Sequence, residues 1–549
     1  MPASDAMGDL ATTPQDVDPR ADRLWPTTAA VLAHRAATTP HAEALVDGER
    51  RWTWADLDDA VDAAARSMIA SSVRHGDRVA VWAPNCAEWI VAALGAQRVG
   101  GVLVPLNTRF LGPEAAFVLR RSRARLLVTV AGFLGKDYPA MLEAAGEPLP
   151  ALDRIVEIGG EPRNGVQTWE DFLAAGAAVH DDELEARAQA VSPHDLSDVL
   201  FTSGTTGRPK GAMCTHAQTL RAYGVWSAVV GLREGDRYLV VNPFFHGFGY
   251  KAGWLACLLT GACIVPQRTL DVPEVLRVIA RERITVLPGT PTLYQTMLEH
   301  PDFSRDGVET LRLAVTGAAA VPAPLLERVR DEIGFSDVVT GYGLTESCAI
   351  VSMCRYDDPV EVVATTAGRP LPGLDVRTVD AEGTPTAPGV PGEIHVRGYT
   401  VMRGYLDDPE ATSQVIDADG WLHTGDVGII DDSGRVHITD RIKDMYIVGG
   451  FNAYPAEIEG ILLGHPEVAQ VAVIGVPDER MGEVGVAFVI PRQGRSITAD
   501  DVVTYARANM ANYKVPRRVR IVESLPMNAS GKVLKGELRA AGLEGSLSW

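Results

Sequence analysis

The chain has 549 residues, of which 46% are hydrophobic and 22% charged, a composition typical of a globular protein with more than one domain. Lys and Arg together number 51 and Asp and Glu 71, which gives a formal charge of −20. This acidic balance argues against a general nucleic-acid binder or a protein held on anionic membranes, so a polyanionic ligand must meet a local group of donors.

The N-terminal segment and the cysteines favour a cytoplasmic protein. Residues 1–23 are polar and lack the apolar core of a signal peptide, so we expect residues 1–24 to form a flexible arm. The longest apolar stretch, about residues 253–265, is too short for a membrane span. Six cysteines without C-x-x-C spacing predict neither a disulfide framework nor a zinc site, as expected in a reducing compartment.

Residues 25–440 are predicted to form one large α/β domain. Apolar, β-branched runs alternate with alanine-rich amphipathic stretches, as in 78–82 followed by 87–98 and 124–130 followed by 136–145. Such alternation predicts layered α/β subdomains with mostly parallel strands.

Two changes of pattern follow towards the C-terminus. From Leu374, short strands such as 392–396 and 435–438 lie between Gly, Pro and Asp turns, which predicts a β-rich subdomain. Beyond a boundary near 440–444, residues 441–549 are predicted to form a small, mobile α+β domain. Its expected elements are a helix at 455–463, strands at 468–476 and 483–490, a helix at 499–509 and a strand at 518–522.

The strongest chemical signal is the segment T-S-G-T-T-G-R-P-K-G at 202–211, which follows residues 198–201, a segment predicted to form a buried strand. Glycines let backbone N–H groups approach a phosphate, hydroxyls add donors, and Lys210 supplies charge. The segment lacks the Gly-Lys-Ser/Thr ending of a Walker A loop. Composition alone leaves a phosphate-binding loop and a polar surface turn equally open.

Five further motifs follow in order: G-Y-G-L-T-E-S at 341–347, H-T-G-D at 423–426, D-R-I-K-D at 440–444, G-G-F-N-A-Y-P-A-E-I-E at 449–459 and N-A-S-G-K at 528–532. With 202–211 they resemble the motifs of the adenylate-forming superfamily of acyl-CoA synthetases, adenylation domains and firefly-type luciferases. The resemblance covers nearly the whole chain. It implies an ATP-dependent acid–thiol ligase that uses Mg²⁺, activates a carboxylic acid as an acyl-adenylate and transfers the acyl group to coenzyme A.

Four residues are implied to act in catalysis. A substrate carboxylate is ionised at pH 7 and needs no general base, so activation depends on positioning and on stabilising charge. By resemblance, Glu346 would hold Mg²⁺, and Thr345 would donate to the α-phosphate. Lys532 would bridge the carboxylate and the α-phosphate, and His246 would border the acyl pocket and gate the thiol.

The resemblance also implies a nucleotide site. Asp426 would accept hydrogen bonds from the ribose hydroxyls with help from Arg441, and Tyr342 would stack on adenine, unless its ring is simply part of the core. The full set of ATP- or AMP-binding residues is Thr202, Ser203, Gly204, Thr205, Thr206, Lys210, Gly317, Ala318, Ala319, Gly341, Tyr342, Gly343, Thr345, Asp426, Arg441 and Lys532.

Two further sites complete the expected enzyme. Lys443 matches the hinge about which the small domain turns between half-reactions, and Gly449 and Gly450 would line the channel for the pantetheine arm. The acyl pocket is expected to include Phe245, His246, Phe248, Tyr250 and Lys251. Lys251 has two interpretations: it faces solvent, or it reaches a polar group of the substrate.

The acyl substrate is open to more than one interpretation. Segments 242–253 and 440–459 are most similar to those of actinobacterial CoA ligases of steroid ring degradation, which act on a bicyclic indanedione propanoate. The alternative within the ligases is a medium- or long-chain fatty acid. A luciferase-like oxygenase and an adenylation enzyme that loads a carrier protein are the alternatives of another class. The expected partners are therefore small molecules, with a homodimer as a compatible assembly.

Overall fold

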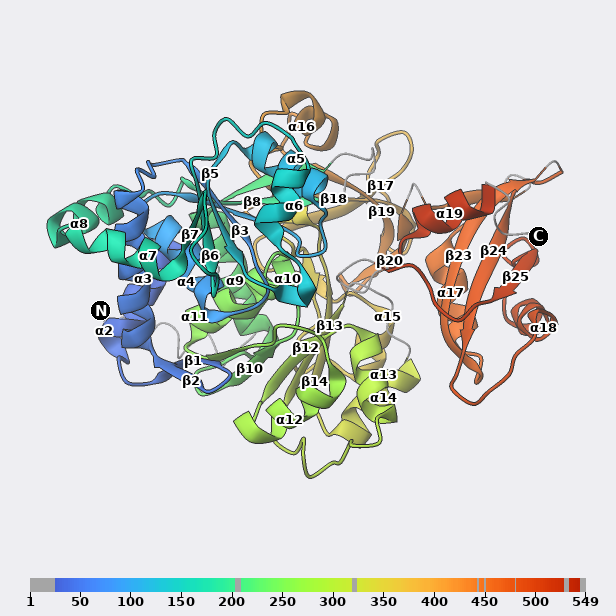
Figure 1. The fold of residues 1–549 in the computed structure, drawn as a ribbon. Coiled ribbons are helices and arrows are strands. Elements are labelled where there is room, and N and C mark those ends of the chain that lie inside the picture. Colours follow the sequence, from blue (N-terminus) through green and yellow to red (C-terminus); the bar gives the residue numbers. More distant parts are fainter. Residues whose placement is uncertain are drawn as a thin grey trace.

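The structure is a computed structural model that describes residues 25–202, 209–317, 323–441, 444–448, 451–478, 480–527 and 533–543. Two large sheets, a smaller antiparallel sheet and a separate C-terminal domain make up the chain (Figure 1). The expected arm at 1–24 lies outside the described residues.

The first large sheet has seven strands in the order β7-β6-β5-β3-β4-β8-β9, all parallel except the last pair. The strands are β3 (Arg78–Trp82), β4 (Val102–Pro105), β5 (Ala124–Val130), β6 (Arg154–Ile158), β7 (Val166–Thr168), β8 (Leu196–Thr202) and β9 (Lys210–Thr215). The helices along this part of the chain are α3 (Trp54–Ala70), α4 (Ala87–Arg98), α5 (Gly112–Ser122), η2 (Phe133–Gly135), α6 (Tyr138–Ala144), α7 (Trp169–Ala175), η3 (Gly176–Ala178) and α8 (Asp181–Gln189).

The second large sheet has nine strands in the order β16-β15-β14-β13-β12-β10-β11-β1-β2. They are β1 (Glu43–Asp47), β2 (Arg50–Thr53), β10 (Arg237–Val240), β11 (Cys263–Pro266), β12 (Val286–Gly289), β13 (Leu313–Gly317), β14 (Asp337–Tyr342), β15 (Ser352–Met353) and β16 (Arg369–Pro370). Its helical segments are α2 (Thr28–Thr38), α9 (His216–Val230), α10 (Gly247–Gly249), η4 (Tyr250–Leu255), α11 (Ala256–Thr260), α12 (Val272–Glu282), α13 (Pro291–Glu299), α14 (Ala323–Arg328), η5 (Val329–Ile333), η6 (Thr345–Ser347) and α15 (Val360–Thr365).

Helix α4 joins the two large sheets into one core. All of its residues except Glu88 are buried, which accounts for its almost uniformly apolar sequence. Trp89 packs against Phe244 and Trp254, with ring centroids 5.4 and 6.0 Å apart. On its other side Gly95 lies so close to α3 that a Cβ atom would meet Ala64 at 3.0 Å. The apolar residues of both sheets therefore share one continuous core.

The β-rich subdomain is a four-stranded antiparallel sheet, β17-β18-β19-β20, with one short helix. Its elements are β17 (Asp375–Val379), β18 (Gly392–Arg397), α16 (Pro409–Val415), β19 (Leu422–Ile430) and β20 (Val436–Arg441). This sheet was expected from the turn-rich sequence after Leu374, and strand β20 leads from it into the C-terminal domain (Figure 1).

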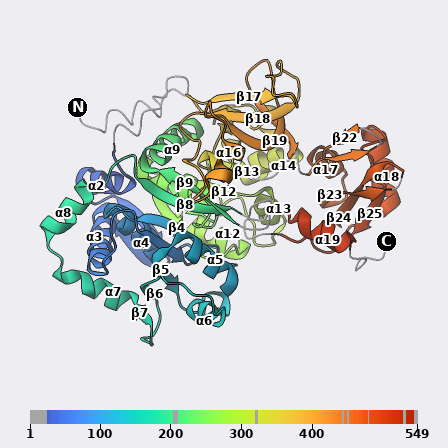
Figure 2. The same cartoon turned by 90° about the horizontal axis from the view of Figure 1, so that it is seen from above.

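The C-terminal domain lies beside the rest of the chain in both views (Figures 1 and 2). Its five-stranded sheet has apolar clusters of its own, separate from the large core. The elements are β21 (Tyr446–Val448), β22 (Phe451–Ala453), α17 (Pro455–Leu463), β23 (Val468–Asp478), β24 (Gly482–Pro491), α18 (Ala499–Asn509), β25 (Arg518–Ile521) and α19 (Lys535–Leu543).

The predicted fold class is confirmed: layered α/β subdomains and a β-rich subdomain are followed by a smaller α+β domain. One helix differs in its limits from the expected 136–145. Helix α6 begins at Tyr138 because the side chain of Asp137 caps it by accepting a hydrogen bond from the backbone N–H of Ala140. Within the described ranges, every helix is too short or too polar to cross a bilayer.

Candidate active site

The predicted phosphate loop connects two paired strands. Strand β8 ends at Thr202 and β9 begins at Lys210, and these two residues are opposite each other in the antiparallel pair. Both side chains are half-buried. The described residues thus place the two ends of the loop side by side, whereas Ser203, Gly204, Thr205 and Thr206 lie outside them.

Tyr405 brings the loop strand and Glu346 together. The segment that carries Tyr405 pairs with β9, since Met213 N–H donates to Gly404 O and Leu406 N–H donates to Gly211 O. The Tyr405 hydroxyl donates to Oε1 of Glu346 at 2.7 Å. Its ring also lies 5.1 Å from Nζ of Lys210, within cation–π range.

Sequence reasoning missed Tyr405, because no local motif marks it and its partners lie far away in the chain. Burial, reinforced by the charge of Glu346, raises the pKa of Tyr405 above its ordinary value. The phenol therefore stays protonated at neutral pH and serves as a hydrogen-bond donor. One oxygen of Glu346 is oriented by this bond, which leaves the other for a cation.

The backbone around Thr345 and Glu346 is tightly constrained. The short helix η6 is followed by two non-glycine residues in the left-handed region, Cys348 (φ 55°) and Ala349 (φ 68°). Gly343 fits against this bend only because it has no side chain, since a Cβ atom would lie 2.3 Å from the carbonyl oxygen of Ala349. The bend therefore fixes where the metal-ligand candidate Glu346 lies.

The expected ribose and adenine residues come from three strands. Gly317 ends β13 and pairs with Gly341 near the end of β14, so both lie at the carboxyl edge of the parallel sheet. Tyr342 is the next residue, and its hydroxyl donates to Oδ2 of Asp426 on β19 at 2.6 Å. Asp426 is 3% exposed and is opposite Arg441 in the β19–β20 pair.

The acyl-pocket candidates divide into two groups. His246 is exposed and Phe245 and Phe248 are half-buried, so these three can contact a ligand. Tyr250 is completely buried, and its hydroxyl is 3.0 Å from Nε2 of Gln97. Because this polar atom already has a partner inside the protein, the expectation that Tyr250 lines the pocket is not met in this structure.

The expectation that Lys251 faces solvent is wrong. Its side chain is 0% exposed, and Nζ lies 2.9 Å from Oδ1 of Asp198, which is equally buried. Burial alone would lower the pKa of Lys251, but the Asp198 carboxylate outweighs it and holds the pKa well above its ordinary value. Contact with a polar group of the substrate would require Lys251 to leave this ion pair, so the structure gives the lysine an internal role.

The Lys251–Asp198 ion pair connects three segments of the candidate site. Asp198 belongs to β8, which leads into the phosphate loop, and Lys251 directly follows the acyl-pocket segment. Nζ of Lys251 is also 3.6 Å from Sγ of Cys348, in the bend after Glu346. Charged groups inside a core are held by their partners, so this pair fixes the relative positions of the segments.

Several expected residues lie outside the described part of the chain. They are Ser203, Gly204, Thr205, Thr206, Ala318, Ala319, the side chain of Arg441, Lys443, Gly449, Gly450 and Lys532. Their roles remain predictions. The described residues bring together Lys210, Glu346 and Tyr405 in one cluster and Tyr342 and Asp426 in a second.

Known families and proteins match the chain over most of its length. Residues 32–406 match the model of the AMP-binding enzyme family, and residues 457–532 match the model of the AMP-binding enzyme C-terminal domain. The crystal structure of the anthranilate CoA ligase AuaEII in complex with anthranoyl-AMP has a TM-score of 0.87 and 29% identity. That match covers 98% of this chain and 100% of the other.

Two relatives share about half of their residues with this chain. Both are named 3-[(3aS,4S,7aS)-7a-methyl-1,5-dioxo-octahydro-1H-inden-4-yl]propanoyl:CoA ligase. The protein from Rhodococcus jostii (strain RHA1) is 50% identical over 516 residues, which is 93% of this chain and 98% of the relative. The protein from Mycobacterium tuberculosis (strain H37Rv) is 49% identical over 516 residues, which is 94% of this chain and 99% of the relative.

Proposed function

The chain belongs to the AMP-binding enzyme family, and from this premise we propose that it is an ATP-dependent CoA ligase for a 7a-methyl-1,5-dioxo-octahydroindenyl propanoate. The observation that carries the substrate is the identity of 50% and 49%, over nearly the full length, to two ligases named for this acid. We refer to the acid as the indanedione propanoate.

The proposed reaction has two steps. A carboxylate oxygen of the acid attacks the α-phosphorus of ATP, the bond to the β-phosphate oxygen breaks, and pyrophosphate leaves. The thiol of coenzyme A then attacks the acyl carbonyl carbon, loses its proton and displaces AMP. The first step requires no base, because the acid is already a carboxylate at pH 7, so in this step the protein acts mainly by positioning the reactants and compensating charge.

The described residues have the chemistry that the first step needs. Lys210 supplies positive charge beside the phosphate loop, and Asp426 offers carboxylate oxygens to the ribose hydroxyls. Glu346 is suited to Mg²⁺, because it is a hard oxygen donor that Tyr405 orients through one of its two oxygens. Bound there, Mg²⁺ would neutralise phosphate charge in the transition state.

Residues outside the described ranges complete the proposal through the family resemblance. Lys532 would contact the carboxylate and α-phosphate during adenylation. Rotation about Lys443 would then replace it with the Gly449–Gly450 segment, along which the pantetheine arm passes. Two adjacent glycines suit a narrow passage, because a side chain there would fill it.

The accessible part of the acyl segment suits a broad, rigid ligand. Phe245 and Phe248, which precede and follow the exposed His246 in the chain, are both half-buried. A flat bicyclic acid can contact aromatic faces over its whole width, whereas a linear chain would leave part of the space unfilled. Tyr250 and Lys251 are not proposed as donors to the ring ketones, since both are buried and paired.

The test is a comparison of acids in a coenzyme A-dependent assay. Specificity constants are measured for the indanedione propanoate, palmitate and a short linear acid, with pyrophosphate release and loss of free thiol followed in parallel. We expect the specificity constant for the indanedione propanoate to exceed those for the other two acids by at least about tenfold, the scale on which apolar pockets discriminate between substrates. A preference for palmitate would contradict the proposed substrate. Thioester formation without ATP would contradict the proposed ligase activity.

A further inference from the structure

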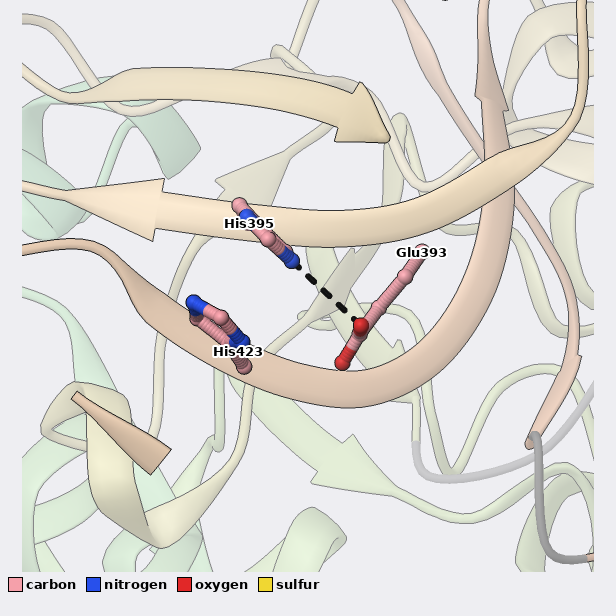
Figure 3. A group of neighbouring side chains, drawn as sticks. All are labelled: Glu393, His395 and His423. Atoms are coloured by element: carbon pink, nitrogen blue, oxygen red, sulfur yellow. Dashed lines mark hydrogen bonds and ion pairs between the residues drawn. The ribbon is translucent and has the colours of Figure 1, made fainter. Parts of the chain in front are cut away.

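Three potential metal ligands lie together on the β17–β20 sheet. Glu393 and His395 belong to β18, and His423 belongs to β19 directly opposite His395 (Figure 3). One donor atom from each of the three lies within 4.8 Å of the other two. The two imidazole rings are stacked, with centroids 4.0 Å apart and an interplanar angle of 18°. The two histidines are therefore packed against each other beside a carboxylate, whereas surface histidines ordinarily point into solvent one at a time.

The carboxylate of Glu393 lies at one end of the two stacked rings (Figure 3). Its Oε2 is 3.3 Å from Nε2 of His395, and its Oε1 accepts a hydrogen bond of 2.9 Å from the N–H of Gly425. The carboxylate is therefore held by the backbone on one side and presented to the histidines on the other. A ligand that is fixed in this way loses little conformational freedom when it binds an ion.

The partner of His423 is the second argument for an ion. Nε2 of His423 lies 3.3 Å from Oδ2 of Asp417, which leaves its other nitrogen for the cluster. Metal-binding histidines almost always contact a carboxylate, carbonyl or water through the nitrogen that does not bind the metal. Asp417 provides that contact.

Burial supplies the third argument. His395 is 5% exposed, and its Nε2 faces the carboxylate of Glu393 rather than bulk solvent. Glu393 and His423 are more accessible, with side-chain exposures of 25% and 37%, so an ion can enter from the His423 side. Two imidazoles and one carboxylate are the donor set of zinc and neighbouring divalent transition metals, whereas Mg²⁺ prefers oxygen ligands.

We propose that Glu393, His395 and His423 bind one divalent transition-metal ion of the zinc class, separate from the Mg²⁺ site proposed at Glu346. The ion takes one oxygen of Glu393 and one nitrogen from each ring, with water in the remaining position. Binding tilts the stacked rings apart, because both lone pairs must point at one ion. Since its ligands come from two strands, the ion links β18 to β19 three residues before Asp426.

The test begins with wild-type protein freed of metal by a chelator that is then removed. Zn²⁺ binding is measured by competition with a chromophoric chelator, and Co²⁺ binding by its visible absorption bands. We expect one equivalent to bind, and saturating Co²⁺ to raise Tm because the ion binds the folded chain. Failure of the wild-type protein to bind one equivalent below millimolar concentration would overturn the proposal, whatever the variants do.

Three variants locate the ion. His395→Gln and His423→Gln should each weaken binding by at least about tenfold and abolish the Tm rise, and Asp417→Asn should weaken it by about 10- to 100-fold through its contact with His423. Equal affinity in wild type and His395→Gln would place the ion elsewhere and overturn the site.

His437→Gln is the matched control. Nε2 of His437 is 3.0 Å from Oδ2 of Asp431, six residues earlier, just as His423 is paired with Asp417. Within the described ranges His437 belongs to no cluster of three potential ligands. The control should bind Zn²⁺ like wild type, and a tenfold loss in this variant would show that the effect is not specific to the cluster, which would also overturn the site.

Discussion

The Tyr342 hydroxyl donates to Oδ2 of Asp426 at 2.6 Å, which joins the end of β14 in the nine-stranded sheet to β19 in the four-stranded sheet. Both residues were expected at the nucleotide from their motifs, and neither motif predicted that the two side chains contact each other. The bond holds the ring of Tyr342 and orients a carboxylate that is 3% exposed. The proposed adenine and ribose contacts are thus coupled before any nucleotide binds.

Tyr342→Phe tests this coupling. The ring remains, but Asp426 loses one donor, so we expect the KM for ATP to rise by about fivefold, the effect of roughly 1 kcal/mol of hydrogen bonding, with kcat less affected. The measurement is the initial rate of pyrophosphate release against ATP concentration. Tyr294→Phe, which removes a hydroxyl bonded to Leu287 O in the same sheet, should leave that KM unchanged. An unchanged KM in Tyr342→Phe would contradict the coupling.

Glu346→Gln should raise the Mg²⁺ concentration for half-maximal pyrophosphate release by at least about tenfold, because a neutral amide is a weaker ligand for a hard cation. Tyr405→Phe should raise it by about threefold, since the carboxylate loses its orienting bond. If Tyr405 acts through Glu346, the double variant will resemble Glu346→Gln alone. Additive effects on the Mg²⁺ titration would assign Tyr405 a separate role.

Lys251→Met should lower the free energy of unfolding by about 3–5 kcal/mol, because it leaves the Asp198 carboxylate buried without its counter-charge. Urea unfolding measures this loss. Lys251→Met combined with Asp198→Asn removes both charges and should recover more than half of it. The ratio of specificity constants for the indanedione propanoate and palmitate should be the same in Lys251→Met and wild type. A changed ratio would show that Lys251 contributes to the acyl pocket.

Lys532→Ala and Gly450→Leu should impair opposite half-reactions. The lysine is proposed to face the site only during adenylation, so its loss should abolish pyrophosphate release and spare acyl transfer from supplied acyl-adenylate. The leucine should obstruct the pantetheine passage, so a single turnover of pyrophosphate release should persist without thioester. Equal losses of both half-reactions in Lys532→Ala would contradict the two orientations, and a normal thioester yield in Gly450→Leu would contradict the channel.

His216 makes the stability of the fold depend on pH. Burial, the largest cause, lowers the pKa of His216 from 6.5 to about 4 in the folded chain, where Nδ1 contacts Thr28. The unfolded chain therefore binds the proton more readily, and stability falls as pH drops from 6.5 towards 4. At pH 5 the loss is about 2 kcal/mol. The free energy of unfolding, measured in urea at pH 7 and pH 5, should differ less between the two pH values in His216→Gln than in wild type. In His194→Gln, which changes an exposed histidine, the difference should equal that of wild type.

The sequence by itself determined several of the regular elements. Strand β3, helix α4 and helices α17 and α18 begin and end where the residue pattern predicts, because apolar periodicity and turn residues act between close neighbours in the chain. The motifs also sufficed to identify the family and the expected nucleotide residues, since each motif is a short continuous segment.

Only the tertiary structure decided which side chains meet. Tyr405 reaches Glu346 across 59 residues, through strand pairing that no local pattern encodes. Lys251 looked like a surface or pocket lysine, yet the order of the sheets places it against Asp198 in the core. His395 and His423 became neighbours through the register of β18 and β19. In each case the partners come from distant segments, and their contact depends on sheet order and strand register, which are set by packing of the whole core.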